Sequence, residues 1–553
     1  MLSIDCFPIS WTISLFGATT LKSLRKSPAA LRWQRIVITV SATLLAACAV
    51  GPDFKQPAAP DAKTYSPTPI GDSTMAAPGP GGDAQHFMMG RDIPFAWWTQ
   101  FQSPKLNALV ERSLKENPTI AAAQAALRQA QEFTNAQRGF FYPTVNAQFT
   151  PTRQKLAGNQ SSSAPGVQGN GANITGYQNP AGPAPYNAPV YYNFYTAQLA
   201  LSYSPDVFGS NRRQVESLKA QEEALRFEME ATYITLASNV VAAAVQEASL
   251  KSQIDATKAY IDQNAKAVDI LHNQLRVGYA MGIDVATQEA ALAQARALLP
   301  PLHKQLEQTH DLIRALCGNL PNEALDDDFD LAALHLPEDL PVTLPSKLIE
   351  QRPDIRAAEE QLHSASAQVG VAVAARLPQF DITAALGGAA SQIPQMFSSG
   401  GPFWNLIGGI TQPIFDGRTL SHKQSAAEQG LIQAQAQYRS TVVTAFQNVA
   451  DTLHAIQSDA DSLAAAAEAE RAAKVVKTLT EKRRELGYVD VLTQLLAEEA
   501  YQQALVNLLQ ARTNRYGDTA ALFQALGGGW WNRPHSDSAD GDAPTKLAAV
   551  NSQ

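Results

Sequence analysis

The stretch RPDIR (Arg352–Arg356) decides how this chain folds, because an earlier stretch, NPTIA (Asn117–Ala121), has the same plan. In both, a proline stands at the first position of a predicted helix, where its missing N–H costs nothing. Pro353 follows Pro118 by 235 residues, and the prolines that close the two helices, Pro143 and Pro378, have the same spacing. Self-similarity at a fixed spacing predicts an internal duplication.

Three further pairs of signals follow in the same order in both copies, 208 to 210 residues apart. They are DVFG (Asp206–Gly209) with IFDG (Ile414–Gly417), RVGY (Arg276–Tyr279) with ELGY (Glu485–Tyr488), and ALCG (Ala315–Gly318) with ALGG (Ala525–Gly528). We therefore expect repeats at 117–318 and 352–531, with a segment 48–116 before them, a linker at 319–351 and a disordered tail at 532–553.

The longest predicted helices carry a seven-residue apolar spacing. Val442, Val449, Ile456 and Leu463 recur at this interval, with Phe446 and Leu453 between them. In the first copy the corresponding residues are Val215, Leu218, Leu225, Met229, Leu236 and Val240. Such spacing predicts coiled-coil packing. A helix from about 210 to 276 would be roughly 100 Å long, which suits a rod or a tunnel wall better than a globular domain.

Helix breakers fit this plan. Gly278, Gly282 and Gly487 predict tight reversals, and Asp284 and Asp490 are expected as N-caps of the returning helices. Pro300-Pro301 predicts a kink or a break in the returning helix of the first copy.

Four segments are candidate strands, at 144–153, 194–205, 379–389 and 404–415. Each has about the length that a tilted transmembrane strand needs. An aromatic girdle at the membrane interface is expected from Tyr191, Tyr192, Phe194, Tyr195, Phe403 and Trp404. Four strands cannot close a barrel, and open edges are not tolerated in lipid. Twelve strands from three chains would close it. The Ser- and Gly-rich segment 154–190 is expected to be a long loop.

The N-terminal region carries an export signal. Basic residues precede a short apolar run, 36–47, which ends in small residues directly before Cys48. This order is typical of a secretory signal, and a cysteine at that place resembles a bacterial lipobox. We therefore expect residues 1–47 to be removed and Cys48 to carry fatty acyl chains, palmitate among them, as a durable membrane anchor.

Composition and motifs argue against several classes of function. The net charge is −8 and no basic run follows the N-terminal region, so nucleic-acid binding has no electrostatic basis. The three cysteines are far apart and predict neither a disulfide framework nor a zinc site. No nucleophile elbow, phosphate loop or metal motif occurs. Arg352 and Asp354 are interpreted as a cap and salt bridge, and Cys317 as a small buried residue. We expect no enzyme, no cofactor and no metal.

Together these residues resemble the TolC-like outer-membrane factors, in the lipoprotein branch that serves resistance-nodulation-division (RND) efflux pumps. The resemblance rests on VGPDF (Val50–Phe54), WWTQFQSPKL (Trp97–Leu106), the region from Leu340 to Glu359 that contains RPDI, and LGGGW (Leu526–Trp530). It covers about 48 to 531. The enlarged 154–190 loop departs from the family pattern.

The resemblance implies a mainly α fold with membrane β-strands. A homotrimer would form a twelve-stranded β-barrel in the outer membrane, continuous with a twelve-helix periplasmic α-barrel. An equatorial belt would combine residues before 105, residues 318–350 and the C-terminal segment. Its function would be a passive exit duct for small molecules and drugs. Its partners would be a periplasmic adaptor (membrane fusion) protein, an inner-membrane RND transporter and outer-membrane lipid.

The same resemblance places the functional sites at the reversals. Docking of the adaptor is expected at the tip residues Arg276, Gly278, Tyr279, Gly282, Asp284, Leu486, Gly487, Tyr488 and Asp490. Turn geometry alone would explain part of the Gly-Tyr signal. The candidate gate residues are Leu492, Leu496 and Glu498, facing the pore, and an apolar Leu496 suggests an apolar gate. Most of these residues fit the core between helices equally well.

Two other functions fit parts of the sequence. One is the exit duct of type I protein secretion, which the lipobox and RPDI segment disfavour. The other is a structural coiled-coil lipoprotein without a channel. A rod of that kind needs no alternating ten-residue segments at matching places in both copies, so the strands discriminate against it.

Overall fold

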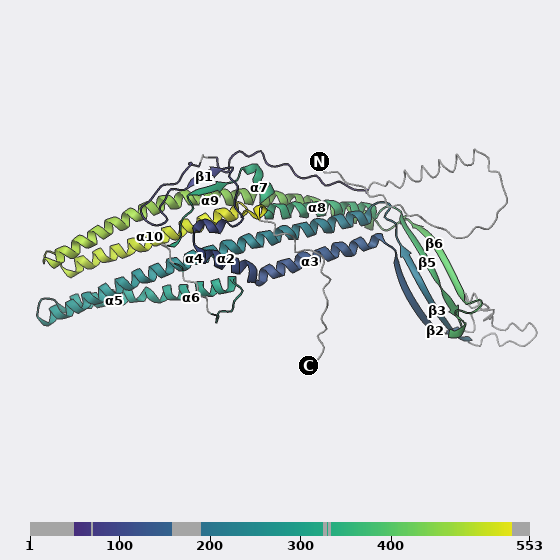
Figure 1. The fold of residues 1–553 in the computed structure, drawn as a ribbon, viewed down its shortest axis with the longest axis horizontal. Coiled ribbons are helices and arrows are strands. Elements are labelled where there is room, and N and C mark those ends of the chain that lie inside the picture. Colours follow the sequence, from purple (N-terminus) through teal and green to yellow (C-terminus); the bar gives the residue numbers. More distant parts are fainter. Residues whose placement is uncertain (1–48, 68–69, 157–189, 324–328, 330–332, 534–553) are drawn as a thin grey trace, which may run out of the picture. The chain divides into compact units, whose positions relative to one another are not determined.

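The structure, a computed structural model, describes residues 49–67, 70–156, 190–323, 329 and 333–533 (Figure 1). Cys48, the predicted signal at 1–47, nearly all of the predicted 154–190 loop and the tail from 534 lie outside the described residues.

The two copies contain the same succession of elements. The first has α3 (Pro118–Arg138), β2 (Thr144–Leu156), β3 (Val190–Tyr203), α4 (Ser210–Arg276), α5 (Gly282–Ala297) and α6 (Leu299–Leu316). The second has α8 (Pro353–Ala374), β5 (Gln379–Ala390), β6 (Pro402–Thr411), α9 (Thr419–Glu485) and α10 (Val491–Ala525). Both long helices, α4 and α9, have 67 residues. The predicted long helices and all four predicted strands are confirmed, with ends shifted by a few residues.

The helix openings follow from local chemistry. Pro118 and Pro353 lie in the first turns of α3 and α8. The Asn117 side chain accepts a hydrogen bond from the Thr119 N–H at 2.7 Å and so satisfies one of the free donors of the first turn. In the second copy Arg352 pairs with Asp354 at 2.6 Å. It also donates to the Ala525 carbonyl at 2.8 Å, which ties the start of α8 to the end of α10.

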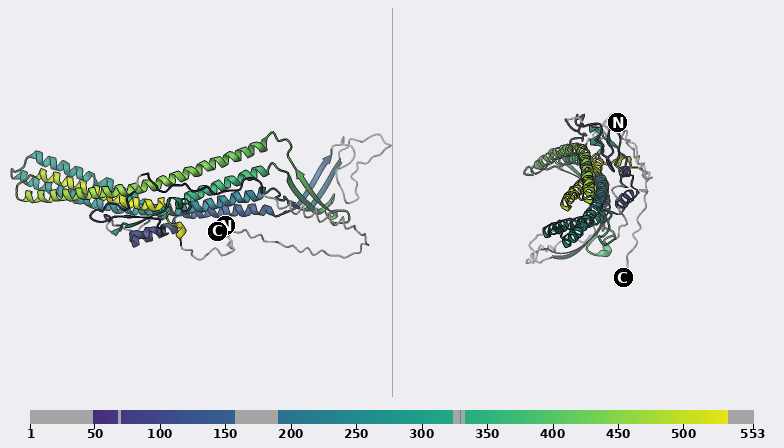
Figure 2. Two further views of the ribbon diagram at one scale, coloured as in Figure 1. Left: turned by 90° about the horizontal axis from the view of Figure 1, so that it is seen from above. Right: turned by 90° about the vertical axis from the view of Figure 1, so that its left-hand side faces the viewer.

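The helices pack side by side in a regular order (Figure 2). Near the strands the order is α3, α4, α8, α9. Towards the reversals, α5 and α6 pack on α4, and α10 lies between α4 and α9. The predicted break in the returning helix lies at Leu298, between α5 and α6 and just before Pro300.

The coiled-coil prediction is confirmed in full for α9 only. Its buried residues include Val442, Val449, Leu453, Ile456 and Leu463. In the first quarter of α4 the predicted apolar stripe is only half-buried, and the buried positions there are mostly small, such as Ser217, Ala220 and Ala224. The reason is that α8 packs closely on this part of α4, and small side chains permit that approach. The Ser217 and Ser364 hydroxyls lie 2.8 Å apart across this contact.

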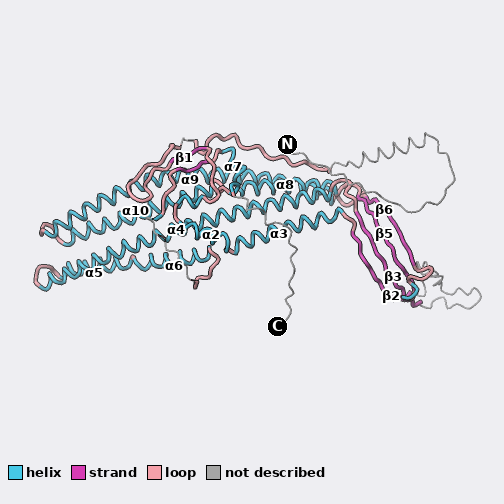
Figure 3. The backbone as a smooth tube through the Cα atoms, in the orientation of Figure 1, coloured by secondary structure: helices cyan, strands magenta, loops and turns pink. Residues whose placement is uncertain are grey.

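The four strands form one antiparallel sheet in the order β2-β3-β5-β6, at the opposite end of the long helices from the reversals (Figure 3). The central pair, β3 and β5, joins the two copies, with Leu199 opposite Leu386. Strands β2 and β6 each have one edge that no described residue pairs.

The two faces of this sheet differ in polarity. Directly opposed residues of an antiparallel pair share a face, so one face carries the rows Val145–Leu201–Ala384–Leu406 and Ala147–Leu199–Leu386–Trp404. The other carries Asn146–Ala200–Ala385–Asn405 and Gln148–Gln198–Gly387–Phe403. One face is therefore almost wholly apolar and largely exposed, whereas the other is mainly small or polar.

The predicted aromatic girdle divides between these faces. Tyr191, Tyr195 and Trp404 lie on the apolar face, but Tyr192, Phe194 and Phe403 lie on the polar one. The sequence run Tyr-Tyr-Asn-Phe-Tyr conceals this division, because successive strand residues point to opposite sides. Only the first group can contact the same surrounding surface.

A compact layer surrounds the middle of the helices. It contains η1 (Trp97–Phe101), α2 (Pro104–Glu116), α7 (Pro345–Gln351) and two short strands, β1 (His86–Met89) and β4 (Asp339–Val342), which pair in parallel. The two short strands were not predicted. The Trp97 and Phe523 rings stack at 5.1 Å between centroids and attach this layer to α10. The layer contains the expected belt segments before 105 and at 318–350, and it also extends through α2 to Glu116, beyond the expected bound.

Two acidic residues face each other between α9 and α10. Burial and a hydrogen bond with Asp518 raise the pKa of Asp459 to about 7, although Arg515 acts to lower it. A raised pKa means that the folded chain favours the protonated carboxyl. This contribution to stability is complete below the unfolded value and is lost as pH rises through about 7.

We therefore expect the thermal midpoint of the folded protein to fall as pH rises through about 7, and this fall to be much smaller in Asp459→Asn. Asp461→Asn is the matched control, since Asp461 is exposed on the same helix. Parallel pH curves for wild type and Asp459→Asn would contradict this role of the acid pair.

Candidate functional site

The two long helices end in the same type of turn. The Tyr279 N–H donates to the Gln274 carbonyl at 2.8 Å, and the Tyr488 N–H donates to the Arg483 carbonyl at 2.9 Å. This bond to the carbonyl five residues back defines a Schellman ending, which needs a left-handed residue just before its donor. The duplication therefore extends to the hydrogen bonding of the reversals.

Glycine supplies the left-handed residue in both turns. Gly278 has φ +82° and Gly487 has φ +77°. A Cβ at either position would meet nothing within 4 Å, so backbone conformation alone calls for glycine there. Turn geometry does not explain the next residues, because Tyr279 is 86% exposed and Tyr488 is 79% exposed. In the two predicted Gly-Tyr pairs, the glycines are therefore required by the turns. The tyrosines are exposed and available for contact with another protein.

The predicted caps of the returning helices have different outcomes. Asp490 is the N-cap of α10 and accepts a hydrogen bond from the Thr493 N–H at 2.8 Å. Asp284 is not the N-cap of α5. Helix α5 begins at Gly282 after the N-cap Met281, and Asp284 is the third residue of the first turn, where its carboxylate accepts a hydrogen bond from the Met281 N–H at 2.9 Å, as in a capping box. The helix starts earlier than expected because Gly282 itself adopts helical geometry.

The reversals expose an unusual number of large apolar side chains. They are Val277, Tyr279, Met281, Ile283, Leu486, Tyr488, Leu492 and Leu496. Leu492 and Leu496 lie one helical turn apart on α10, 52% and 59% exposed, so they share a face. Arg276, the remaining predicted tip residue, donates to Asn273 at 2.8 Å in the last turn of α4.

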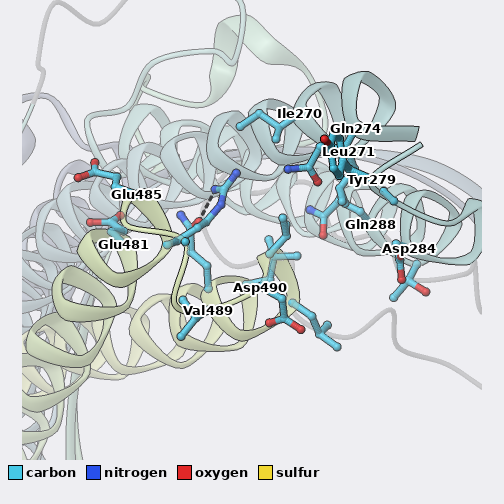
Figure 4. Close-up of a pocket in the computed structure, with 18 residues that line it drawn as sticks. Ile270, Leu271, Gln274, Tyr279, Asp284, Gln288, Glu481, Glu485, Val489 and Asp490 are labelled. Carbon is cyan, nitrogen blue, oxygen red and sulfur yellow. Dashed lines mark hydrogen bonds between the residues drawn. The ribbon is translucent and has the colours of Figure 1, made fainter. Parts of the chain in front are cut away.

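Both reversals line one cavity of about 800 Å³ (Figure 4). From the first copy it includes Gln274, Tyr279, Asp284 and Gln288, and from the second Glu481, Glu485, Gly487, Asp490 and Leu492. Arg484 and Gln494, which also line it, are hydrogen-bonded to each other across the α9–α10 turn. Residues that lie about 200 apart in sequence thus form one space at the tip.

Glu498 does not face an open space, and this part of the gate prediction is wrong. Its side chain is 4% exposed and forms an ion pair with Lys477 of α9 at 2.8 Å. Further chains can only add to this burial. Burial raises the pKa of Glu498, and the bond from Lys477 partly offsets that rise.

The ion pair also contacts the other copy. In the amide orientation that satisfies both neighbours, Gln263 of α4 donates to Glu498 at 3.1 Å and accepts from Lys477 at 3.2 Å. The Lys477 ammonium lies 4.8 Å from the centre of the Tyr501 ring. Neither Lys477 nor Gln263 was predicted from the sequence as part of this site. The available signal was a lysine on the side of α9 that packs against α10, because a charged residue at such a position needs a partner on the facing helix.

Two further findings bear on the class of protein. In the described part of the chain, no helix is both long and apolar enough to cross a membrane. Among the same residues, no three His, Cys, Asp or Glu side chains gather as a metal site would require.

The chain matches the family model "Outer membrane efflux protein" over residues 109–319 and 344–528, most of its length. It is 29% identical to the pyoverdine export outer membrane protein OpmQ of Pseudomonas aeruginosa, over 84% of this chain and 94% of that protein. It is 27% identical to the toluene efflux pump outer membrane protein TtgC of Pseudomonas putida, over 90% and 96%. The solved outer-membrane channel OprN has 26% identity and a TM-score of 0.74, over 87% of this chain and all of that one.

Proposed function

Because this chain belongs to the outer membrane efflux protein family and is an outer-membrane exit duct of RND-type efflux pumps, we propose that it works as a passive trimeric conduit closed at its helical tip. The observation that carries this proposal is the sheet. It has an apolar face, a polar face and two open edges at one end of helices that are roughly 100 Å long.

The open edges call for further copies. Strand edges exposed to lipid would leave backbone donors and acceptors unsatisfied, at a cost of several kcal/mol for each group. Strand β2 of one chain is free to pair with β6 of the next, and three chains would give a closed sheet of twelve strands. The apolar face would then meet lipid and the Gln148–Gln198 face would line the path. Helices α4 and α9 and their returning partners would continue the wall into the periplasm.

The segment after Cys48 supports acylation of that cysteine. The Val50 N–H donates to the Phe208 carbonyl at 3.2 Å, at the junction of β3 and α4. Arg213, 5% exposed, holds the Val50 carbonyl at 3.2 Å and Asp53 at 2.7 Å. A lipid on Cys48 would therefore enter the membrane where the strands begin, as a second anchor beside the strands.

We assign the gate to Leu492 and Leu496, with Glu498 and Lys477 behind them as packing support. Exposed apolar side chains of three chains would meet at the axis and exclude water. Tyr279, Tyr488 and their neighbours would form the docking surface for a periplasmic adaptor protein, which connects the duct to an inner-membrane RND transporter. Opening would need the α9–α10 hairpin to move away from α4.

The relatives support a duct that does not select its cargo. One is named for pyoverdine export and another for toluene efflux, yet both are about equally similar to this chain. The chemistry of those two cargoes differs widely. A wall without a dedicated binding site would accept both, and the pump would then determine what enters.

Charge at the gate should open it. In Leu492→Asp/Leu496→Asp, six carboxylates of a trimer would repel one another at the axis, so single-channel conductance in planar bilayers should rise several-fold over wild type. The control Leu312→Asp alters a half-exposed leucine on α6, far from the tip, and should leave conductance unchanged. A purified trimer that never conducts, with or without the gate carboxylates, would contradict the conduit. It would favour a structural lipoprotein instead.

A further inference from the structure

The outer end of the sheet is nearly free of charge. Between residues 139 and 205, and between residues 382 and 415, the sequence contains only two charged side chains, Arg153 and Lys155. Both are positive and both lie on β2. The connecting segment 157–189 contains no Asp or Glu that could neutralise them.

The register places both cations on the apolar face. Arg153 is opposite Asn193 and Lys155 is opposite Tyr191, in the same alternation as Val145 and Leu201. Both side chains are exposed. The Lys155 ammonium lies 5.4 Å from the centre of the Tyr191 ring, and that ring is itself 61% exposed. Among its described residues the sheet contains one acidic side chain, Asp381 of β5, which lies on the polar face. The face that meets lipid therefore provides no counter-charge for the two cations.

Their depth corresponds to the membrane surface. Lys155 follows Val145 by ten residues, which is about 33 Å along an extended strand, and a strand tilted by about 40° rises roughly 25 Å over that distance. The apolar band of such sheets is roughly 25 Å tall. Lys155 therefore lies at the edge of the apolar band, and Arg153, two residues before it, can extend its long side chain to the same level. The end of β2 that carries both residues is the end away from the helices (Figure 3), where the headgroups of the outer leaflet begin. A cation at this depth costs little, whereas the same residue near Leu199 would face hydrocarbon.

We propose that Arg153, Lys155 and Tyr191 form a binding site on the outer rim for the phosphate groups of an anionic outer-leaflet lipid of the lipopolysaccharide type. The two cations would contact the headgroup phosphates, and the tyrosine ring would pack on the adjoining sugar or acyl region. A trimer would carry three such sites. The inference rests on the outer-membrane location and the proposed closed sheet, and it is independent of the gate.

The test uses the full-length protein, stripped of lipid and reconstituted into phosphatidylcholine nanodiscs that contain a small share of diphosphoryl lipid A. Lipid A that remains bound after extraction into mild detergent is counted by native mass spectrometry. Wild type should retain it, and Arg153→Gln/Lys155→Gln should lower the affinity roughly tenfold or more, since each cation contributes to attraction of anionic lipid. Retention by wild type should also fall with added salt.

The controls separate this site from general charge effects. Lys219→Gln/Lys304→Gln removes two exposed lysines from the helices and should retain lipid A as wild type does. Arg153→Lys keeps the charge and should retain most of the binding, so it covers the case that the double variant fails to assemble. Inorganic phosphate should displace no more lipid than sodium chloride does at the same ionic strength.

Equal retention by wild type and Arg153→Gln/Lys155→Gln would overturn the proposal. So would displacement by inorganic phosphate beyond that caused by sodium chloride at the same ionic strength, which would indicate a plain anion site. Conductance of the Leu492→Asp/Leu496→Asp channel should be the same with and without the rim substitutions. Loss of conductance in every variant would instead count against the conduit.

Discussion

Replacing Leu199 by arginine is expected to abolish assembly of the protein in the outer membrane. Leu199 lies on the apolar face of β3, 51% exposed, between Ala147 and Leu386. An arginine on a lipid-facing strand costs up to about 2–4 kcal/mol, the value at the bilayer midplane. Three copies would therefore cost up to about 6–12 kcal/mol in a trimer, which is comparable to the whole stability of a typical domain.

Gln198→Arg is the matched control, because it lies one residue away on the same strand and faces the other side. The Gln198 side chain donates to Gln148 at 3.0 Å on the polar face, where water would fill the path. This variant should assemble and reach the outer membrane in nearly normal amounts. The measurement is the heat-resistant trimer in outer-membrane fractions. Equal assembly of Leu199→Arg and Gln198→Arg would mean that the polarity of the two faces has no effect on assembly. Assembly of Leu199→Arg alone would mean that the two faces have been assigned the wrong way round.

The sequence predicted the strands because period-two alternation and length are local properties. Phe380, Ile382, Ala384 and Leu386 alternate with polar or small residues, and β5 covers them all. The register between strands is not local. Only the pairing of Leu199 with Leu386 showed that both copies contribute to one sheet. The aromatic girdle was predicted too broadly for the same reason, since composition does not tell which face each ring occupies.

At the tip, the predictions that depended on backbone geometry were more accurate than those that depended on orientation. Gly278, Gly487 and Asp490 were located by turn and cap chemistry, which acts within a few residues. Glu498 was misplaced because Leu492, Leu496 and Glu498 are close in sequence but do not share a face of α10. Two of them are exposed, whereas Glu498 turns towards Lys477 of α9. The sequence around Glu498 does not show that its carboxylate has a partner on another helix.

The Lys477–Glu498 pair gives the second large effect. Lys477→Met would leave the Glu498 carboxylate buried without its cation, a change that costs about 3–5 kcal/mol in typical cases. The contact between the α9–α10 hairpin and α4 should loosen, because Gln263 bridges to the same pair. We expect faster proteolysis of the α9–α10 turn and a rise in single-channel conductance, with the sheet unaffected.

The double variant Lys477→Met/Glu498→Leu should restore a closed and protease-resistant tip, since two apolar side chains of similar volume often replace a buried ion pair without loss. The single variant should also respond to pH. Without Lys477 the pKa of Glu498, already raised by burial, should rise further, so acid protonates the carboxyl and removes the unpaired charge. The Lys477→Met defect should therefore diminish as pH falls. If the double variant conducts as much as the single one, the charges of the pair themselves close the tip. Packing around Leu492 and Leu496 would then be insufficient to keep the gate closed.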